Sequence, residues 1–149
     1  MTSKTEGRPI RHEVRVEAPI EIVRTYFTDP KRIVEWWPTR ATVDARVGGD
    51  VALEFDQPDG RTDRALGTFI ELARDRIVLT WGFERDSDLP PGSSRVEITL
   101  EPDGPGTLVR LEHYGLPESR RRNHDDGWAL FLSRLRSIAR SDGPRTMRA

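Results

Sequence analysis

The clearest pattern of hydrophobic and polar positions lies from Asp125 to Arg140. Apolar residues recur there at intervals of three and four: Trp128, Phe131, Leu132, Leu135, Ile138 and Ala139. This spacing places them on one side of an α-helix, with serine and arginine side chains on the other side. We therefore expect a long amphipathic helix that covers the apolar face of another element.

Most of the remaining chain alternates between apolar and polar residues, with the period of two that is typical of strands with one buried face. The first predicted strand spans residues 10–17, with Ile10, His12, Val14 and Val16 on one face. Further strands are predicted at residues 41–45, 51–56, 61–72, 76–83, 93–101 and 107–115. Segments rich in glycine, proline and aspartate separate them and are typical of tight turns. We expect residues 84–92 to form a polar surface loop.

Two short helices are predicted between the first and second strands. The first begins at Ala18-Pro19, because proline is tolerated in the first turn of a helix, and it ends at Thr28-Asp29-Pro30. The second spans approximately residues 31–36. This order of elements predicts an α+β fold, in which a curved antiparallel sheet of about six to seven strands wraps around the long C-terminal helix. A helix packed on a curved sheet usually leaves a pocket along the seam.

Length and composition restrict the class of protein. The chain has 149 residues, and we expect a single domain at residues 9–141 between flexible ends at 1–8 and 142–149. It contains no cysteine, which excludes disulfide bonds and thiolate metal ligands. The formal net charge of −1 gives no general attraction for nucleic acid or an anionic membrane, so neither is an expected partner.

The sequence also bears on the compartment. No apolar run approaches the ~20 residues of a membrane-spanning helix, and residues 1–7 lack the apolar centre of a signal peptide. We therefore expect a cytoplasmic protein. The adjacent arginines at positions 120–122 lack interleaved aromatic residues, and they are expected to form a solvated face rather than a nucleic-acid site.

Short signatures along nearly the whole chain resemble those of one family. They include Ala18-Pro19, Glu35-Trp36-Trp37-Pro38, Val47-Gly48-Gly49, Asp59-Gly60, residues 76–81, residues 106–116 and Asp126-Gly127-Trp128. In this order they resemble the START-like helix-grip (SRPBCC) superfamily, in the branch similar to the C-terminal domain of the activator of Hsp90 ATPase. The resemblance implies a cavity between sheet and helix, often for apolar small molecules and usually without a dedicated cofactor. Its members include binding proteins, cyclases of polyketide-like substrates, stress-associated proteins and co-chaperone domains.

Two histidines are candidates for polar chemistry in such a cavity. Val109, Leu111 and His113 share one face of a predicted strand, so His113 points inward if that face is buried. A neutral imidazole there would bind a ligand oxygen or act as a general base, or it would be satisfied by a neighbouring group. His124 precedes Trp128 by one helical turn and is expected on the same stripe. The sequence lacks a compact metal-binding motif, so we predict no metal site, and the family resemblance implies no cofactor.

Aromatic residues are the expected lining of the cavity, and they also suit an ordinary core. Trp81 shares a strand face with Ile77 and Leu79, which predicts an inward orientation. Trp36 and Trp37 end the second short helix, where one is expected at the mouth of the pocket and the other half exposed. The predicted ligand-binding residues are Tyr26, Trp37, Phe69, Trp81, His113, His124, Trp128 and Phe131.

Gly127 lies inside the predicted long helix, where glycine costs roughly 1 kcal/mol relative to alanine. Close approach of the helix to a strand, or a bend that widens the pocket, would explain it. The other explanation is that the regular helix begins near Gly127, with residues 118–126 forming a separate turn. The sequence leaves these alternatives open.

We expect a binding protein for an apolar or aromatic small molecule, held between the sheet and the C-terminal helix. One alternative is a cyclase- or hydrolase-like enzyme that uses His113 as acid and base. The other is a co-chaperone-like domain that contacts a chaperone or another protein through its surface. A monomer or a homodimer is compatible with each hypothesis. The Trp128 end of the helix is expected to face His113 and Trp81, with residues 135–139 in the plain core.

Overall fold

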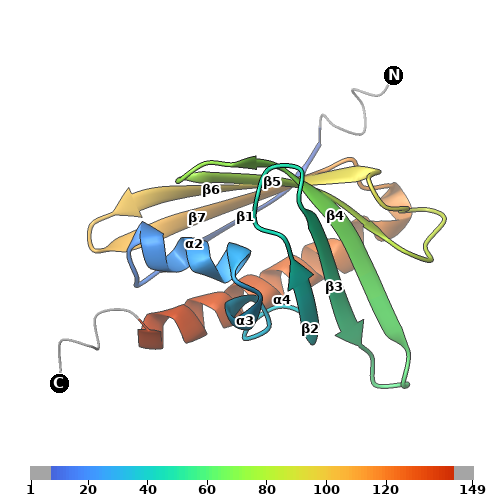
Figure 1. Ribbon diagram of the computed structural model, residues 1–149, viewed down its shortest axis with the longest axis horizontal. Helices are drawn as coiled ribbons and strands as arrows, with labels where there is room; N and C mark the ends of the chain where they lie inside the picture. Colours follow the sequence, from blue (N-terminus) through green and yellow to red (C-terminus); the bar gives the residue numbers. More distant parts are fainter. Residues whose placement is uncertain (1–7, 143–149) are drawn as a thin grey trace.

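One curved sheet wraps around a long helix in the computed structural model, which describes residues 8–142 (Figure 1). The strands are β1 (Ile10–Val16), β2 (Arg40–Val43), β3 (Asp50–Asp56), β4 (Thr62–Leu72), β5 (Arg76–Phe83), β6 (Ser94–Asp103) and β7 (Gly106–Tyr114). The helices are α2 (Ile20–Thr28), α3 (Pro30–Ile33) and α4 (Glu118–Asp142). The predicted α+β helix-grip fold is confirmed. The predicted flexible ends fall almost entirely outside the described residues.

The sheet is an antiparallel meander with spatial order β1-β7-β6-β5-β4-β3-β2. Each strand from β2 to β7 pairs with its neighbour in the chain, and β1 pairs with β7 at the other edge. In β7, Val109, Leu111 and His113 are fully buried, as the alternation predicted. Ile10 and Val14 of β1 lie opposite two of these residues and are also buried. The core therefore lies between one face of the sheet and the helices.

Helix α4 begins at Glu118, about two turns before the residues whose spacing predicted it. The alternative in which residues 118–126 form a separate turn is therefore wrong. This part of the helix escaped the pattern because His124 is its only buried residue. Polar contacts hold it instead: Arg120 donates to the carboxylate of Asp86, and Arg121 donates to the carbonyl of Arg8.

Helices α2 and α3 bring two tryptophans into the core. Helix α3 is a single turn and ends before the predicted residue 36. Trp36 packs edge-on against Phe27, and its indole Nε1–H donates to the carbonyl of Tyr26. Trp37 stacks on Trp81. Both tryptophans of the pair are buried, so the expectation that one of them is half exposed is wrong.

The loop between β5 and β6 folds back against β5. Gly82 permits the close approach, because a Cβ at this position would lie 2.0 Å from the carbonyl oxygen of Pro90. Leu89 is fully buried, and its carbonyl accepts a hydrogen bond from the backbone N–H of Phe83 at 2.8 Å. The other residues of the loop are mostly exposed. The predicted polar surface loop thus has one apolar anchor.

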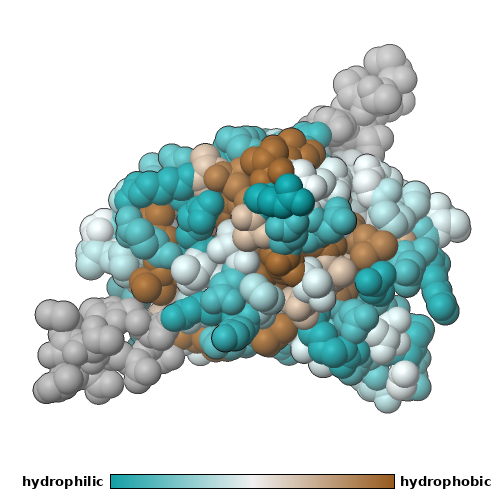
Figure 2. Space-filling model, viewed as in Figure 1, coloured by the Kyte–Doolittle hydropathy of each residue, from teal (hydrophilic) through white to brown (hydrophobic). Residues whose placement is uncertain are grey.

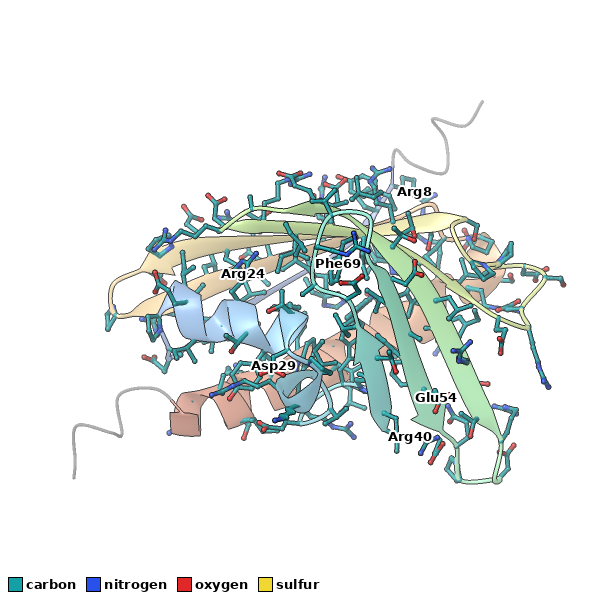
Figure 3. The ribbon with its side chains drawn as sticks, viewed as in Figure 1. Arg8, Arg24, Asp29, Arg40, Glu54 and Phe69 are labelled. Carbon is teal, nitrogen blue, oxygen red and sulfur yellow. The ribbon has the colours of Figure 1, made fainter. Side chains whose placement is uncertain are left out.

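Ion pairs cover much of the outer surface. Figure 2 shows hydrophilic side chains over most of this face of the molecule, including the end of the β3–β4 hairpin. Near that end Arg40 donates to Glu54 and to Asp56, and Figure 3 shows Arg40 and Glu54 close together on neighbouring strands. Exposed pairs of this kind contribute roughly 0–1 kcal/mol each. The stability of the fold therefore comes mainly from the core.

Candidate functional site

A pocket opens where α4 passes the β3–β4 hairpin and the end of β5. We call it the inner pocket, and its volume is about 310 Å³. Six aromatic residues, five polar residues and one glycine line it: Trp37, Phe55, Trp81, Phe83, Trp128, Phe131, Gln57, Arg61, Asp63, Asn123, His124 and Gly127. Its position between the sheet and the C-terminal helix is the seam that the order of elements predicted.

Three tryptophans form the floor of the inner pocket. The rings of Trp37 and Trp81 stack with centroids 5.6 Å apart and planes 6° from parallel. Trp128 packs against both, with its ring centroid 5.2 Å from Trp37 and 6.0 Å from Trp81. Ring pairs at these distances contribute roughly 0.5–1.5 kcal/mol each beyond the area that they bury. Because the rings come from three distant segments, the floor exists only in the folded chain.

Further aromatic rings form the walls. Phe55 from β3 and Phe131 from α4 face each other with ring centroids 5.9 Å apart. The guanidinium of Arg134 lies 5.4 Å from the centroid of Phe131, a favourable cation–π position. Phe83 meets Trp81 edge-on at 5.6 Å. The walls are therefore apolar, and they suit apolar or aromatic contents.

Gly127 lies in the middle of α4 and opens the pocket on the side of the helix. The helix is continuous through this position, so glycine is not needed to end or begin it. A Cβ there would meet only the ring of Phe131, at an ordinary contact distance of 3.9 Å. Close approach to a strand therefore does not explain the glycine. Its neighbours at one-turn spacing, His124 and Phe131, line the pocket, so a side chain at position 127 would project into that space.

Two histidines accept hydrogen bonds from the tryptophans of the floor. Trp128 Nε1–H donates to Nδ1 of His113 at 3.1 Å, and Trp81 Nε1–H donates to Nε2 of His124 at 3.1 Å. An indole nitrogen only donates, so each imidazole must offer an unprotonated nitrogen. His113 therefore carries its proton on Nε2 and donates to Ser94 Oγ at 2.9 Å. The Ser94 hydroxyl in turn donates to the carbonyl of Trp81 at 2.8 Å.

Both imidazoles are consequently held in the neutral form. Nδ1–H of His124 donates to the carbonyl of Arg120 at 3.1 Å. Burial lowers the pKa of His113 well below its ordinary value, and the nearby His124 acts in the same direction. Burial also lowers the pKa of His124. A proton on either ring would remove the acceptor that a tryptophan uses and would place a charge in the core.

His113 is fully buried and does not line the inner pocket. Both of its ring nitrogens are engaged, one by Trp128 and one by Ser94. To act as a general base, it would have to release the indole of Trp128 and gain access to the pocket. The arrangement therefore agrees with the alternative in which neighbouring side chains satisfy this histidine.

A larger depression continues outward from the inner pocket, and we call it the outer groove. Its volume is about 950 Å³. Charged and polar residues provide nearly all of the lining: Glu54, Arg61, Thr62, Asp63, Arg64, Phe83, Glu84, Arg85, Asp86, Ser119, Arg120, Asn123 and His124. Five of these also line the inner pocket, so the two spaces adjoin.

A small polar cluster marks the boundary between the two spaces. Arg61 Nε donates to Oδ1 of Asp63 at 3.2 Å, and Gln57 Nε2 donates to Oδ2 of Asp63 at 3.0 Å. Arg61 also donates from Nη1 to Asp59 at 3.1 Å. Asn123 lies on α4 on the same boundary, with an exposed side chain. The site thus changes from aromatic to strongly polar from the inside outward.

Comparison with protein families decides the relationship. A family model described as activator of Hsp90 ATPase homolog 1-like protein matches residues 17–140. The chain belongs to this family. The resemblance read from the short signatures is thereby confirmed. A comparison with curated proteins finds no match.

Solved structures share the fold of this Hsp90-activator-like chain. CalU16 from Micromonospora echinospora is 31% identical, with a TM-score of 0.71 over 95% of this chain and 80% of that one. CV1439 from Chromobacterium violaceum is 30% identical, with a TM-score of 0.78 over 90% and 98%. The Aha1 dimer from Colwellia psychrerythraea is 18% identical, with a TM-score of 0.72 over 89% and 96%, and shows the likeness of fold alone.

In this family member, five of the predicted ligand-binding residues line the inner pocket: Trp37, Trp81, His124, Trp128 and Phe131. Three predicted residues do not line it: Tyr26, Phe69 and His113. The hydroxyl of Tyr26 is engaged elsewhere, where it accepts from Arg32 at 2.7 Å. Phe69 pairs with Leu79, and Figure 3 places it toward the opposite end of the β3–β4 pair from Glu54.

Seven lining residues were not among the predicted ligand-binding residues: Phe55, Gln57, Arg61, Asp63, Phe83, Asn123 and Gly127. Phe55 carried a signal, since it alternates with Leu53 on a predicted strand face. Arg61 and Asp63 follow a hairpin turn, and polar residues beside a turn are expected to be solvated in any case. Their place in the site depends on the position of α4 relative to the hairpin.

Among the described residues, no group of three histidine, cysteine, aspartate or glutamate side chains is arranged to hold a metal ion. The same part of the chain has no helix that is long and apolar enough to cross a membrane.

The neutral histidines make the stability of the fold dependent on pH. Both have a lowered pKa in the folded state, so the unfolded chain binds more protons once the pH falls below the ordinary histidine value of roughly 6.5. The free energy of unfolding should therefore fall as the pH is lowered from 7.5 to 5.5, by up to about 1.4 kcal/mol per pH unit for each histidine. Urea titrations across this range measure the slope.

The variant His124→Gln removes one of the two groups and keeps an amide oxygen to accept from Trp81. Its slope should be about half that of the original protein. An unchanged slope in the variant, or a flat profile in the original protein, would contradict the assignment.

Proposed function

We propose that this protein binds an apolar or aromatic small molecule in the inner pocket between the sheet and α4. The supporting observation is a pocket of about 310 Å³ whose floor and walls consist of six aromatic side chains. This volume lies at the lower end of the range of about 300–1,000 Å³ that is usual for small-molecule sites. The rim of polar residues would orient a single polar group of the ligand.

Gly127 supports the proposal independently. Glycine in a helix interior costs roughly 1 kcal/mol relative to alanine. The surroundings of Gly127 have room for a Cβ, so close packing does not explain why the helix has the less stable glycine here instead of alanine. Position 127 has room for a larger residue and yet has no side chain. A requirement for empty space beside the helix explains this. That space is the inner pocket.

The test is to fill the pocket from α4. We expect Gly127→Leu to weaken the binding of 2-naphthol, an aromatic probe of suitable size, at least about tenfold, since its side chain would occupy the same volume. Quenching of tryptophan fluorescence measures the affinity, because Trp37, Trp81 and Trp128 line the pocket. Gly127→Ala should bind more weakly than the original protein and be more stable by about 1 kcal/mol.

A matched control places the same side chain outside the pocket. Ala129 lies on the exposed side of α4 and does not line the inner pocket. Ala129→Leu should bind 2-naphthol as the original protein does. Equal affinity of Gly127→Leu and Ala129→Leu for the probe would refute the proposed site.

The two alternatives differ in what they require of the molecule. An enzymatic role for His113 needs the imidazole to leave both of its hydrogen-bond partners, and the burial of the ring does not favour that. A co-chaperone-like role agrees with the description of the family and needs no pocket at all. An open aromatic pocket favours the binding of a small molecule over both.

A further inference from the structure

We propose that the ligand is a neutral amphipathic molecule, whose aromatic body occupies the inner pocket and whose hydroxylated extension lies in the outer groove. This inference rests on the proposed function and adds the chemical class of the ligand. It starts from the adjacency of the two spaces, since Arg61, Asp63, Phe83, Asn123 and His124 line both of them. A ligand held by the inner pocket would therefore extend into the groove.

The charges that line the outer groove cancel. Four carboxylate residues, Glu54, Asp63, Glu84 and Asp86, stand beside four arginines, Arg61, Arg64, Arg85 and Arg120. A groove of one sign attracts ions of the other sign, whereas a balanced groove exerts little net pull on an ion. The lining therefore does not select for an anionic or a cationic ligand.

Most of these charges are also paired with one another. Arg120 Nε lies 2.6 Å from a carboxylate oxygen of Asp86, and Arg64 Nη1 lies 3.1 Å from one of Glu84. An ionic ligand group would have to displace one partner of such a pair and leave the other without its counter-charge. A neutral polar group faces no such competition.

Hydroxyl groups match the hydrogen-bond donors and acceptors that remain available in the outer groove. A hydroxyl donates one hydrogen bond and accepts two, so it bridges a guanidinium N–H and a neighbouring carboxylate oxygen without breaking their pair. Asn123 adds an exposed neutral amide at the junction with the inner pocket, and its side chain makes no hydrogen bond to the described residues. Several adjacent hydroxyls, as in a polyol or a sugar, would use this density of donors and acceptors best.

The experiment compares four probes that share one aromatic body. They are 2-naphthol, 2-naphthyl β-D-glucopyranoside, 2-naphthyl phosphate and (2-naphthylmethyl)trimethylammonium. We expect the glucoside to bind about tenfold more tightly than 2-naphthol, because two or three added neutral hydrogen bonds have that effect. The two charged probes should bind no more tightly than 2-naphthol. Quenching of tryptophan fluorescence gives all four dissociation constants.

The outcomes separate this inference from the proposed function. Binding of 2-naphthol without a gain from the glucose, or a charged probe as the tightest, would overturn the inference and leave the proposed function standing. Failure of all four probes to bind at millimolar concentration would overturn both.

A pair of variants tests the groove itself. In Asn123→Ala, the affinity ratio of glucoside to 2-naphthol should fall severalfold, since one neutral hydrogen-bonding group at the junction is lost. Ser137→Ala alters an exposed polar residue of the same helix that lines neither space, and its ratio should equal that of the original protein. An unchanged ratio in Asn123→Ala would argue against a ligand that crosses this junction.

Discussion

Trp81→Ala is expected to lower the free energy of unfolding by about 3–5 kcal/mol, the range found when large buried aromatic residues are truncated. The ring of Trp81 is 3% exposed and contacts Trp37, Trp128 and Phe83, so its removal would leave a cavity lined by other rings. It would also leave Nε2 of His124 without its donor. Since small domains are stable by roughly 5–15 kcal/mol, the loss would be a large share of the total.

Urea denaturation, followed by circular dichroism, measures this change. Ile70→Ala is the matched control, because Ile70 is a large apolar residue of the adjacent strand β4 that is 50% exposed, and it should cost less than about 1 kcal/mol. Trp81→Phe keeps a ring and loses the indole N–H, so its effect should fall between the two. A loss below about 1 kcal/mol for Trp81→Ala would show that the aromatic floor is not part of the packed core.

Gly82→Ala is expected to be strongly destabilising, with a loss of about 3 kcal/mol in the free energy of unfolding. The added Cβ would lie 2.0 Å from the carbonyl oxygen of Pro90 and 2.6 Å from Cα of Pro91. Both contacts are with backbone atoms, so no side chain can rotate away. The loop after β5 would have to separate from the strand, and the outer groove would change shape with it, because Glu84, Arg85 and Asp86 belong to this segment.

Gly127→Ala is the matched control for Gly82→Ala, since it makes the same chemical change where space is open. The two variants should move the free energy of unfolding in opposite directions. Thermal unfolding in parallel experiments gives the comparison directly. Equal stabilities would mean that the loop moves away from Gly82 without cost.

The fold could be predicted from the sequence because each element carries its own periodic pattern. Val109, Leu111 and His113 alternate on β7, and all three are buried as that alternation requires. The first turns of α4 were missed, since only His124 is buried there and no apolar stripe marks them. A pattern of apolar residues indicates only the apolar side of a helix that is buried. This part of α4 is instead held by the ion pair between Arg120 and Asp86, which leaves no such pattern.

The candidate site was only partly predictable, for a different reason. Trp81 and Trp128 could be placed because each lies on an apolar face that points inward. Phe55 and Phe131 meet across 76 positions of sequence, and no local pattern relates them. His113 could be placed inside. Its hydrogen-bond partners could not be predicted, because Trp128 and Ser94 approach it from other elements. The periodic pattern within one element does not predict its contacts with other elements.

The pairing of β1 with β7 at the edge of the sheet has a consequence for biosynthesis. Ile10 pairs with His113, so the first strand has no partner until more than a hundred further residues have been made. Such non-local pairing makes folding slow. In addition, Trp37, Trp81 and Phe83 stay uncovered until α4 has been made, since α4 forms the other side of the inner pocket. Nascent chains that stall before α4 should therefore be targets for chaperones. The inner pocket is therefore complete only after α4 has been made, because α4 supplies Asn123, His124, Gly127, Trp128 and Phe131 to its lining.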